Sequence, residues 1–398
     1  MPRLTLRGLG LVTAGVVLLI GAGTTGLRSL AWPGGLLLGL VVAAAVLTRR
    51  SARKPVLRRV LGTDRVSAGS VARVTLELGR DSVNLGAWGF LDETVPDGLR
   101  GGPRIPVPSG PGRLYSRHPY ELATVVRGRY PVGPSRWTTI DPLGLTRLSR
   151  NLGGRTLLTV TPAVHQLDQA APAAGTGLVG EAAQRHSIVL SPDDVLIREY
   201  RPRDELRRIH WPSTARTGKL MVRREEHAWE PSAMILLDNR RAGHTGHGPL
   251  SSFEWSVSAA ASVGVHLLDA GYDIGLVDAA GRRLDTDSTN LRESLLDHLT
   301  DSALTDAGDL DGALSADIGG RAQLFLAIIG RLSAADALAL TAARRHGALC
   351  RAIIVQPVEP GPDDPVEILT ANGWRVIPNA GVRGIADSWS ALAKEPVR

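Results

Sequence analysis

The chain opens with two long apolar runs that contain no charged residue, at residues 8–27 and 29–48, and Arg28 alone separates them. Each run is long enough for a helix to cross about 30 Å of hydrocarbon. The pattern therefore predicts a transmembrane helical hairpin within residues 1–54, with the lipid bilayer as its first partner.

Basic residues around the two runs predict their orientation. Arg3 and Arg7 precede the first run, and Arg49 and Arg50 begin a basic stretch after the second, against Arg28 alone in the connection. Because basic flanks stay on the cytoplasmic side, both termini of this two-span cell-membrane protein are expected in the cytoplasm. The alternative is a cleaved signal peptide followed by a single anchor.

Residues 55–168 change to short runs in which apolar and polar positions alternate, as at 72–78, 120–126 and 156–160. A period of two is typical of strands with one buried face. Several such strands between Gly and Pro residues predict an all-β, sandwich-like antiparallel domain. Asp141, in the sequence DPLGL, is expected to form a turn through its side chain and not to act as a catalytic acid.

Residues 233–398 alternate apolar strands with amphipathic helices. The order begins with a strand at 233–237, a helix at 251–268, a strand at 272–277, a helix at 290–299, a strand at 323–329 and a helix at 333–345, and the alternation continues through 348–355, 365–371, 374–377 and 382–393. Such alternation implies a mostly parallel α/β sheet covered on both sides. Between the two domains, residues 169–185 have the composition of a linker, and residues 186–232 form a separate segment.

That separate segment contains the sequence REYRPRDELRRIHWPSTARTGKLMVRREE at residues 198–226. A disordered basic tail would lack its apolar residues, so a folded unit is expected. Asp204 can cap a short helix, and Pro212 starts a new turn. Gly218 suits the left-handed position that ends a helix, and residues 219–224 alternate like a strand. The prediction is a compact coil, helix, turn and strand that carries a row of arginines.

The same segment resembles the signature of the bacterial family called "domain of unknown function 58", in which the pattern Arg-x-Tyr-x-Pro-x-Asp-x-x-Arg-x-Ile-x-Trp-x-x-x-Ala-Arg precedes a von Willebrand factor A-like domain. The residues that match are Arg198, Tyr200, Pro202, Asp204, Arg207, Ile209, Trp211, Ala215 and Arg216. The resemblance implies a membrane hairpin, a β-rich segment and a doubly wound von Willebrand A-like domain. It also implies a MoxR-type AAA+ ATPase as partner and a role in assembling or maturing other envelope proteins.

Asp238 follows the first expected strand of the α/β domain, at the edge where open parallel sheets bind ligands. The von Willebrand family carries Asp-x-Ser-x-Ser there, which suits Mg²⁺. In this chain Arg240 and Ala242 stand in place of the two serines. A cation beside a guanidinium is unfavourable, so we expect no metal or other cofactor and a pairing of Asp238 with Arg240, Arg241 or a signature arginine. Mg²⁺ at Asp238 is the alternative.

The arginine row is the leading candidate for a functional site, with two interpretations. Its arginines either form charge-assisted pairs with Asp204, Glu199 or Asp238, or remain exposed and receive an acidic partner or phosphate. The candidate partner-binding or structural residues are Arg198, Tyr200, Asp204, Arg207, Arg208, Trp211 and Arg216. Trp211 is expected to be a core anchor rather than an exposed contact.

Charge and composition narrow the function. The chain has a net charge of +7, but its first 60 residues hold nine of the 46 basic residues and no acidic one, which leaves 37 basic against 39 acidic groups in the rest. A nucleic-acid partner needs a basic face on the folded body, so none is expected. The single cysteine, Cys350, lies in an apolar run and is expected in a buried strand. His244 and His247 are expected in a solvated loop, with zinc binding as the alternative.

Together these observations predict a membrane-tethered, cytoplasm-facing protein-interaction or assembly factor rather than an enzyme. The alternative is a metal-dependent hydrolase that uses Asp238 and His210.

Overall fold

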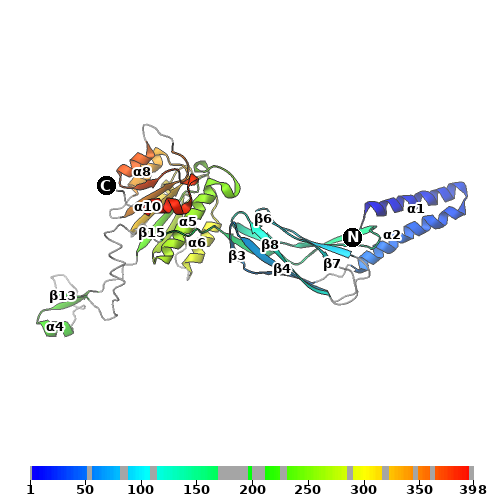
Figure 1. Cartoon of the computed structure of the whole chain (residues 1–398), viewed down its shortest axis with the longest axis horizontal. Helices are drawn as coiled ribbons and strands as arrows, with labels where there is room; N and C mark the ends of the chain where they lie inside the picture. Colours follow the sequence, from blue (N-terminus) through cyan, green and yellow to red (C-terminus); the bar gives the residue numbers. More distant parts are fainter. Residues whose placement is uncertain are drawn as a thin grey trace. The chain divides into compact units, whose positions relative to one another are not determined.

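Figure 1 shows the computed structural model of the chain, which describes residues 2–51, 56–80, 88–107, 114–168, 196–199, 211–224, 231–284, 290–315, 322–343, 348–358 and 364–393. The chain divides into two compact units, Met1–Ala163 and Val164–Arg398. The division between the two units falls between Ala163 and Val164, close to the predicted end of the β-rich domain at residue 168. The linker predicted at 169–185 lies outside the described residues.

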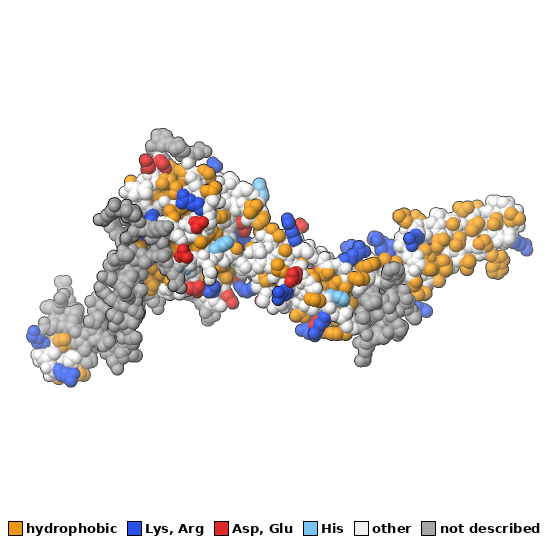
Figure 2. Space-filling model, in the orientation of Figure 1, with side chains coloured by type: hydrophobic (Ala, Val, Ile, Leu, Met, Phe, Trp, Pro, Cys, Tyr) orange, Lys and Arg blue, Asp and Glu red, His pale blue; other side chains and the backbone are white. Residues whose placement is uncertain are grey.

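The first unit begins with the predicted helical hairpin, which consists of α1 (Leu6–Thr25), a short 3-10 turn η1 (Arg28–Leu30) and α2 (Ala31–Ser51). Both helices are long and apolar enough to cross a membrane. They approach closely where Gly15 of α1 faces Gly34 of α2, because a side chain at either glycine would press on the opposite helix. Hydrophobic side chains cover the outside of the hairpin (Figure 2).

The rest of the first unit is β-rich. Its strands are β1 (Arg3–Leu4), β2 (Val56–Leu61), β3 (Arg65–Ser67), β4 (Val71–Arg80), β5 (Trp88–Glu93), β6 (Leu99–Arg100), β7 (Arg104–Val107), β8 (Leu114–Thr124), β9 (Gly128–Val132), β10 (Ser135–Ile140), β11 (Thr146–Leu152) and β12 (Thr156–Thr161). They form three sheets with the orders β1-β11-β10-β5-β7, β2-β4-β8-β6 and β3-β12-β9.

The β-rich part is a sandwich in which the sheet β2-β4-β8-β6 contributes to two apolar cores. Leu76 and Leu78 of β4 pack against the sheet of β10 and β11, whereas Ala72 and Val74 of the same strand pack against the sheet of β9 and β12. The pairing is antiparallel except between β12 and β3, which run parallel. The expectation of an antiparallel domain is wrong at that pair. Many residues separate β3 from β12 in sequence, and a long connection of this kind is what parallel pairing requires.

The second unit contains the predicted α/β domain. Its strands are β15 (Ser232–Leu237), β16 (Asp273–Asp278), β17 (Leu324–Ile329), β18 (Leu349–Ile354) and β19 (Arg375–Ile377), and its α-helices are α5 (Ser252–Asp269), α6 (Leu291–Thr300), α7 (Asp311–Ser315), α8 (Ala334–Ala342), α9 (Pro365–Ala371) and α10 (Ile385–Ala393). These elements confirm the predicted alternation, and α7 is an addition to it. The strands form one parallel sheet in the order β16-β15-β17-β18-β19.

Helices cover both faces of this sheet (Figure 1). One core lies between the sheet and α5, α6 and α10, and the other lies between the sheet and α7, α8 and α9. The strands are apolar on both faces for this reason, and β17 is buried along its whole length. Cys350 is buried in β18, as predicted from its apolar neighbours.

The described part of the signature segment forms a small unit by itself. β13 (Leu196–Glu199) pairs antiparallel with β14 (Met221–Arg224), and α4 (Trp211–Thr217) lies between them in sequence. Gly218 follows α4 with a φ of +69°, which confirms its predicted left-handed role. The hydroxyl of Thr214 accepts a hydrogen bond of 3.0 Å from the Met221 backbone N–H and joins the helix to the strand.

Candidate functional site

The parallel sheet has one point where the direction of strand order reverses. From β15 the chain moves to β16 on one side and then returns to β17 on the other side. Ligand sites of open parallel sheets lie at such a point, outside the carboxyl ends of the strands. Asp238 directly follows β15 there, and its Oδ2 accepts a hydrogen bond of 3.2 Å from the backbone N–H of Gly330, which directly follows β17.

The side chain of Arg240 lies at this carboxyl end of the sheet, against Asp238. Its guanidinium donates to both oxygens of Asp238, at 2.9 Å from Nε to Oδ1 and 3.1 Å from Nη2 to Oδ2. It also donates to both oxygens of Asp336, at 2.7 Å from Nη1 to Oδ1 and 3.2 Å from Nη2 to Oδ2. We call Arg240 with these two carboxylates the arginine clamp. The clamp confirms the predicted pairing of Asp238 with Arg240.

The clamp is buried. The side chains of Asp238, Arg240 and Asp336 are 0%, 7% and 8% exposed. Burial opposes the charge on Arg240, but hydrogen bonds and charges from the two carboxylates outweigh burial and raise the pKa of the guanidinium. Each charge of the clamp has an opposite charge within hydrogen-bond distance.

A divalent cation does not fit these residues. Mg²⁺ needs carboxylate oxygens with free lone pairs in octahedral geometry, but all four oxygens of Asp238 and Asp336 accept N–H groups from Arg240. Among the described residues, no group of three or more His, Cys, Asp or Glu side chains is arranged to hold a metal. The guanidinium takes the place between two carboxylates that a cation would otherwise fill.

The loop after Arg240 closes over the clamp. His244 is half-buried, its Nε2 lies 2.7 Å from the backbone oxygen of Asp238, and its Nδ1 lies 3.1 Å from the hydroxyl of Ser252. Because a carbonyl only accepts, Nε2 carries the proton. Burial lowers the pKa of His244. The expectation of a solvated loop is wrong for His244, which the loop folds inward, and His247 is exposed.

Asp336 is a clamp residue that the sequence analysis missed. It also forms a capping box with Ser333 at the start of α8, where each residue's side chain bonds the other's backbone. The pattern Ser-x-x-Asp before an apolar run is visible in the sequence as a helix start. It does not show that the same carboxylate reaches Arg240, 96 positions earlier.

The signature residues are only partly described. Arg198 lies in β13, where its backbone pairs with Val222, and Arg216 lies in α4. Tyr200, Asp204, Arg207, Arg208 and His210, with Pro202 and Ile209, lie outside the described residues. The pairs expected between those side chains and the arginine row stay predictions.

Trp211 corrects one prediction. It begins α4 and is 67% exposed, so the expectation of a core anchor is wrong. The physical reason is the size of the unit: α4 has seven residues and buries none of them. Among the described residues of the segment, a single short helix beside two strands offers no second layer in which to bury an indole ring.

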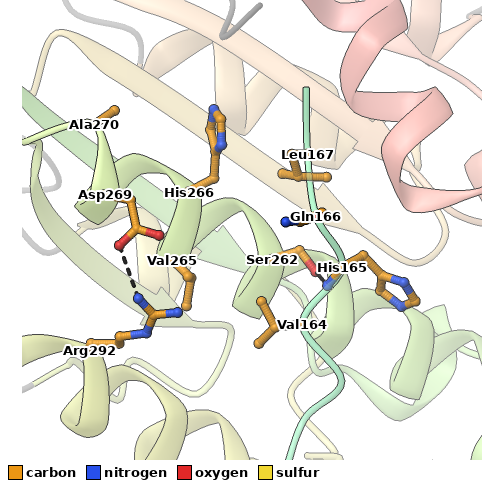
Figure 3. A pocket seen from close by; sticks show the side chains of 10 residues that line it. All are labelled: Val164, His165, Gln166, Leu167, Ser262, Val265, His266, Asp269, Ala270 and Arg292. Carbon is orange, nitrogen blue, oxygen red and sulfur yellow. Dashed lines mark hydrogen bonds and ion pairs between the residues drawn. The ribbon is translucent and has the colours of Figure 1, made fainter. Parts of the chain in front are cut away.

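Figure 3 shows a hollow of about 520 Å³ in the second unit, lined by α5, residues 164–167 and Arg292 of α6. The backbone N–H of His165 donates to the Ser262 hydroxyl at 2.9 Å, and Asp269 binds Arg292 at 3.0 Å. The first contact attaches residues 164–167 to α5 and so to the second unit, whereas the second contact joins α5 to α6. The Asp269 and Arg292 side chains are 61% and 53% exposed, whereas the clamp is buried, so the hollow is weaker than the clamp as a candidate site.

Asp141 behaves as the sequence predicts. Its buried carboxylate accepts hydrogen bonds from the backbone N–H groups of Leu143 and Thr146 and from the Thr146 hydroxyl. These contacts confirm the side-chain turn.

Comparison with known proteins adds one finding. Residues 196–302 match the model of the family described as "Protein of unknown function DUF58", which covers the described signature unit and the chain from β15 to the end of α6. This match confirms the family that the signature resembles. No curated protein matches the chain.

Proposed function

We propose that this chain, whose residues 196–302 belong to the DUF58 family, is a membrane-anchored protein-interaction or assembly factor with a von Willebrand A-like α/β domain. Its hairpin would fix it in the cell membrane with both termini in the cytoplasm. A MoxR-type AAA+ ATPase is the proposed partner, because the resemblance to the family implies it, and other envelope proteins are the proposed clients.

The exposure of the signature unit carries the proposal. Trp211 is 67% exposed, Leu220 is 43% exposed, and Arg216 lies on the same short helix as Trp211. Tryptophan and arginine contribute most strongly to protein interfaces when a partner covers them. An indole that the unit itself leaves in solvent is therefore a contact residue for another protein.

The arginine clamp supports an interaction role over catalysis. A hydrolase would need a carboxylate oxygen of Asp238 for a metal or a water molecule, and Arg240 already binds both of them. His210, the other residue of the hydrolase alternative, lies outside the described residues. No observation on the described part of the chain favours that alternative.

The test is binding of the full-length protein, purified in detergent, to a purified MoxR-type AAA+ ATPase. Trp211→Ala is expected to weaken binding by roughly 30-fold, as for a tryptophan at the centre of an interface. Leu250→Ala is the matched control, because Leu250 is 95% exposed but lies outside the signature unit. Excess EDTA is expected to leave binding unchanged.

Equal binding by wild type and Trp211→Ala would contradict the proposed contact, and loss of binding in EDTA would contradict a metal-independent site. The orientation is tested separately by adding protease to spheroplasts. We expect the second unit to stay intact until the membrane is opened, and cleavage in intact spheroplasts would contradict a cytoplasmic location.

A further inference from the structure

The base of the hairpin is joined to one end of the β-sandwich by specific contacts. The strand β1, just before α1, pairs antiparallel with β11. Thr5 donates to the sheet end twice, from its N–H to Leu145 O at 2.9 Å and from its hydroxyl to Gly144 O at 2.6 Å. Near the end of α2, the Thr48 hydroxyl lies 2.7 Å from the Thr146 hydroxyl. Both helices are thus attached to the same end of one sheet, a place that we call the hairpin foot.

The hairpin foot gathers five arginines. Arg3 and Arg147 are direct partners in the pairing of β1 with β11. Arg7 reaches Gly144 in the turn, and Arg49 and Arg50 follow Thr48. All five are exposed. Figure 2 shows basic side chains beside the apolar coat of the hairpin.

No carboxylate in the described part of the chain forms an ion pair with any of these five arginines. The nearby Asp141 is fully buried, and its oxygens accept bonds from Leu143 and Thr146 instead. Like charges directly opposite each other on paired strands destabilise the pairing. The juxtaposition of Arg3 and Arg147 therefore calls for an anion from outside the chain.

Apolar side chains at the same place indicate which anion. Leu143, at the tip of the Asp141 turn, is 52% exposed, and Leu4 and Leu6 are 47% and 89% exposed. Leucines exposed beside the start of a membrane-spanning helix suit the boundary between headgroups and acyl chains. Free phosphate would satisfy the arginines alone, whereas a phospholipid satisfies the arginines and the leucines.

We propose that the hairpin foot binds the headgroups of anionic phospholipids, with Arg3 and Arg147 on phosphate oxygens and Leu143 at the acyl boundary. A guanidinium binds two phosphate oxygens at once, and cationic residues next to a span attract anionic lipid. This site goes beyond the proposed function, because it binds lipid at the base of the β-sandwich, whereas the signature unit is proposed to bind a protein.

The test measures phospholipid that stays with the full-length protein after purification from mixed micelles of phosphatidylglycerol and phosphatidylcholine, by native mass spectrometry. Wild type is expected to retain phosphatidylglycerol preferentially. The double variant Arg3→Gln/Arg147→Gln is expected to retain about tenfold less of it. A second variant, Arg49→Gln/Arg50→Gln, tests the same site without changing the β1–β11 pair.

Arg136→Gln is the matched control. Arg136 is exposed on β10, next to β11, and it shares a sheet face with Ile140, which is the partner of Arg147. It lies about 13 Å further along the sheet, at about 3.3 Å per residue. Its loss is expected to leave phosphatidylglycerol retention unchanged.

Several results would overturn the proposal: equal retention of both lipids by wild type, unchanged retention in both double variants, or an equal loss in Arg136→Gln. Displacement of phosphatidylglycerol by an equal concentration of inorganic phosphate would also overturn it, since that result describes a site for any small anion. Release of the wild-type protein from membranes by alkaline carbonate would overturn both the lipid site and the membrane anchor. Binding of the ATPase is read separately and does not depend on these results.

Discussion

The arginine clamp and the hairpin foot use the same residue in opposite ways. In the clamp, one buried guanidinium binds two carboxylates through four hydrogen bonds. At the foot, Arg3 and Arg147 stand opposite each other in solvent, without an ion pair in the described chain. A buried arginine needs its counter-charges from the protein, whereas an exposed one can take them from its surroundings. The difference separates an arginine that stabilises the fold from arginines available to a ligand.

The largest effect is expected from breaking the clamp. Arg240→Met leaves the carboxylates of Asp238 and Asp336 buried without a cation, and we expect the free energy of unfolding of the second unit to fall by about 3–5 kcal/mol. Denaturant unfolding followed by tryptophan fluorescence measures this change.

The neighbouring Arg241 supplies the matched control. It also pairs with an aspartate, Asp306, at 2.8 Å, but the two side chains are 62% and 84% exposed. Arg241→Met is therefore expected to cost at most about 1 kcal/mol. If both variants lost the same free energy of unfolding, burial would not be the reason that the clamp stabilises the second unit.

A smaller loss of stability is expected at the hairpin foot, where the carboxylate of Asp141, and not an arginine, fixes the turn. Asp141→Asn removes an acceptor that serves three donors, so we expect a loss of about 1–3 kcal/mol in the first unit. Thermal unfolding in detergent is the measurement. Asp92→Asn is the control, because Asp92 is 40% exposed and faces Arg104 at 3.5 Å; a loss there as large as at Asp141 would contradict the argument.

The smallest effect is expected from pH, through three histidines of the second unit whose pKa values are lowered. Burial lowers the pKa of His244, His266 and His298. The unfolded chain, with a histidine pKa of about 6.5, then binds more protons than the folded unit. Stability is fully present above that value and is lost as the pH falls through it towards the lower folded values.

This pH dependence is measured as the midpoint of urea unfolding at successive pH values below neutrality. His266→Gln is expected to reduce the slope, because Nε2 of His266 is buried and has no hydrogen-bond partner within the described structure. His247→Gln is the control, since His247 is exposed. If the urea midpoint changed with pH equally in wild type and His266→Gln, His266 would not contribute to the pH dependence of stability.

Patterns repeated along the chain made most of the fold predictable. Apolar residues predominate in each strand of the parallel sheet. Ser251 marks the start of α5 by accepting a hydrogen bond from Glu254 N–H, as a helix cap does. The hairpin follows from two uncharged runs. These features depend on neighbours in sequence, which is why a single sequence reveals them.

Pairings between distant residues were not predictable in the same way. Arg240 could be matched with Asp238, two positions away, but nothing in the sequence selects Asp336 as the second carboxylate. The strand β1 has two residues, too few for an alternating pattern, and its partner Arg147 is far along the chain. The burial of Trp211 was predicted wrongly because the sequence pattern of an apolar residue in a charged segment is the same whether its own chain or another protein covers it.

The pairing of Arg3 with Arg147 also sets an order of events during synthesis. The two apolar helices leave the ribosome long before residues 146–147, so the first edge strand must wait, unpaired, while most of the sandwich is translated. Closing so long a loop is slow compared with forming a helix. The sandwich would therefore complete its outer sheet last, against a hairpin that is already in place.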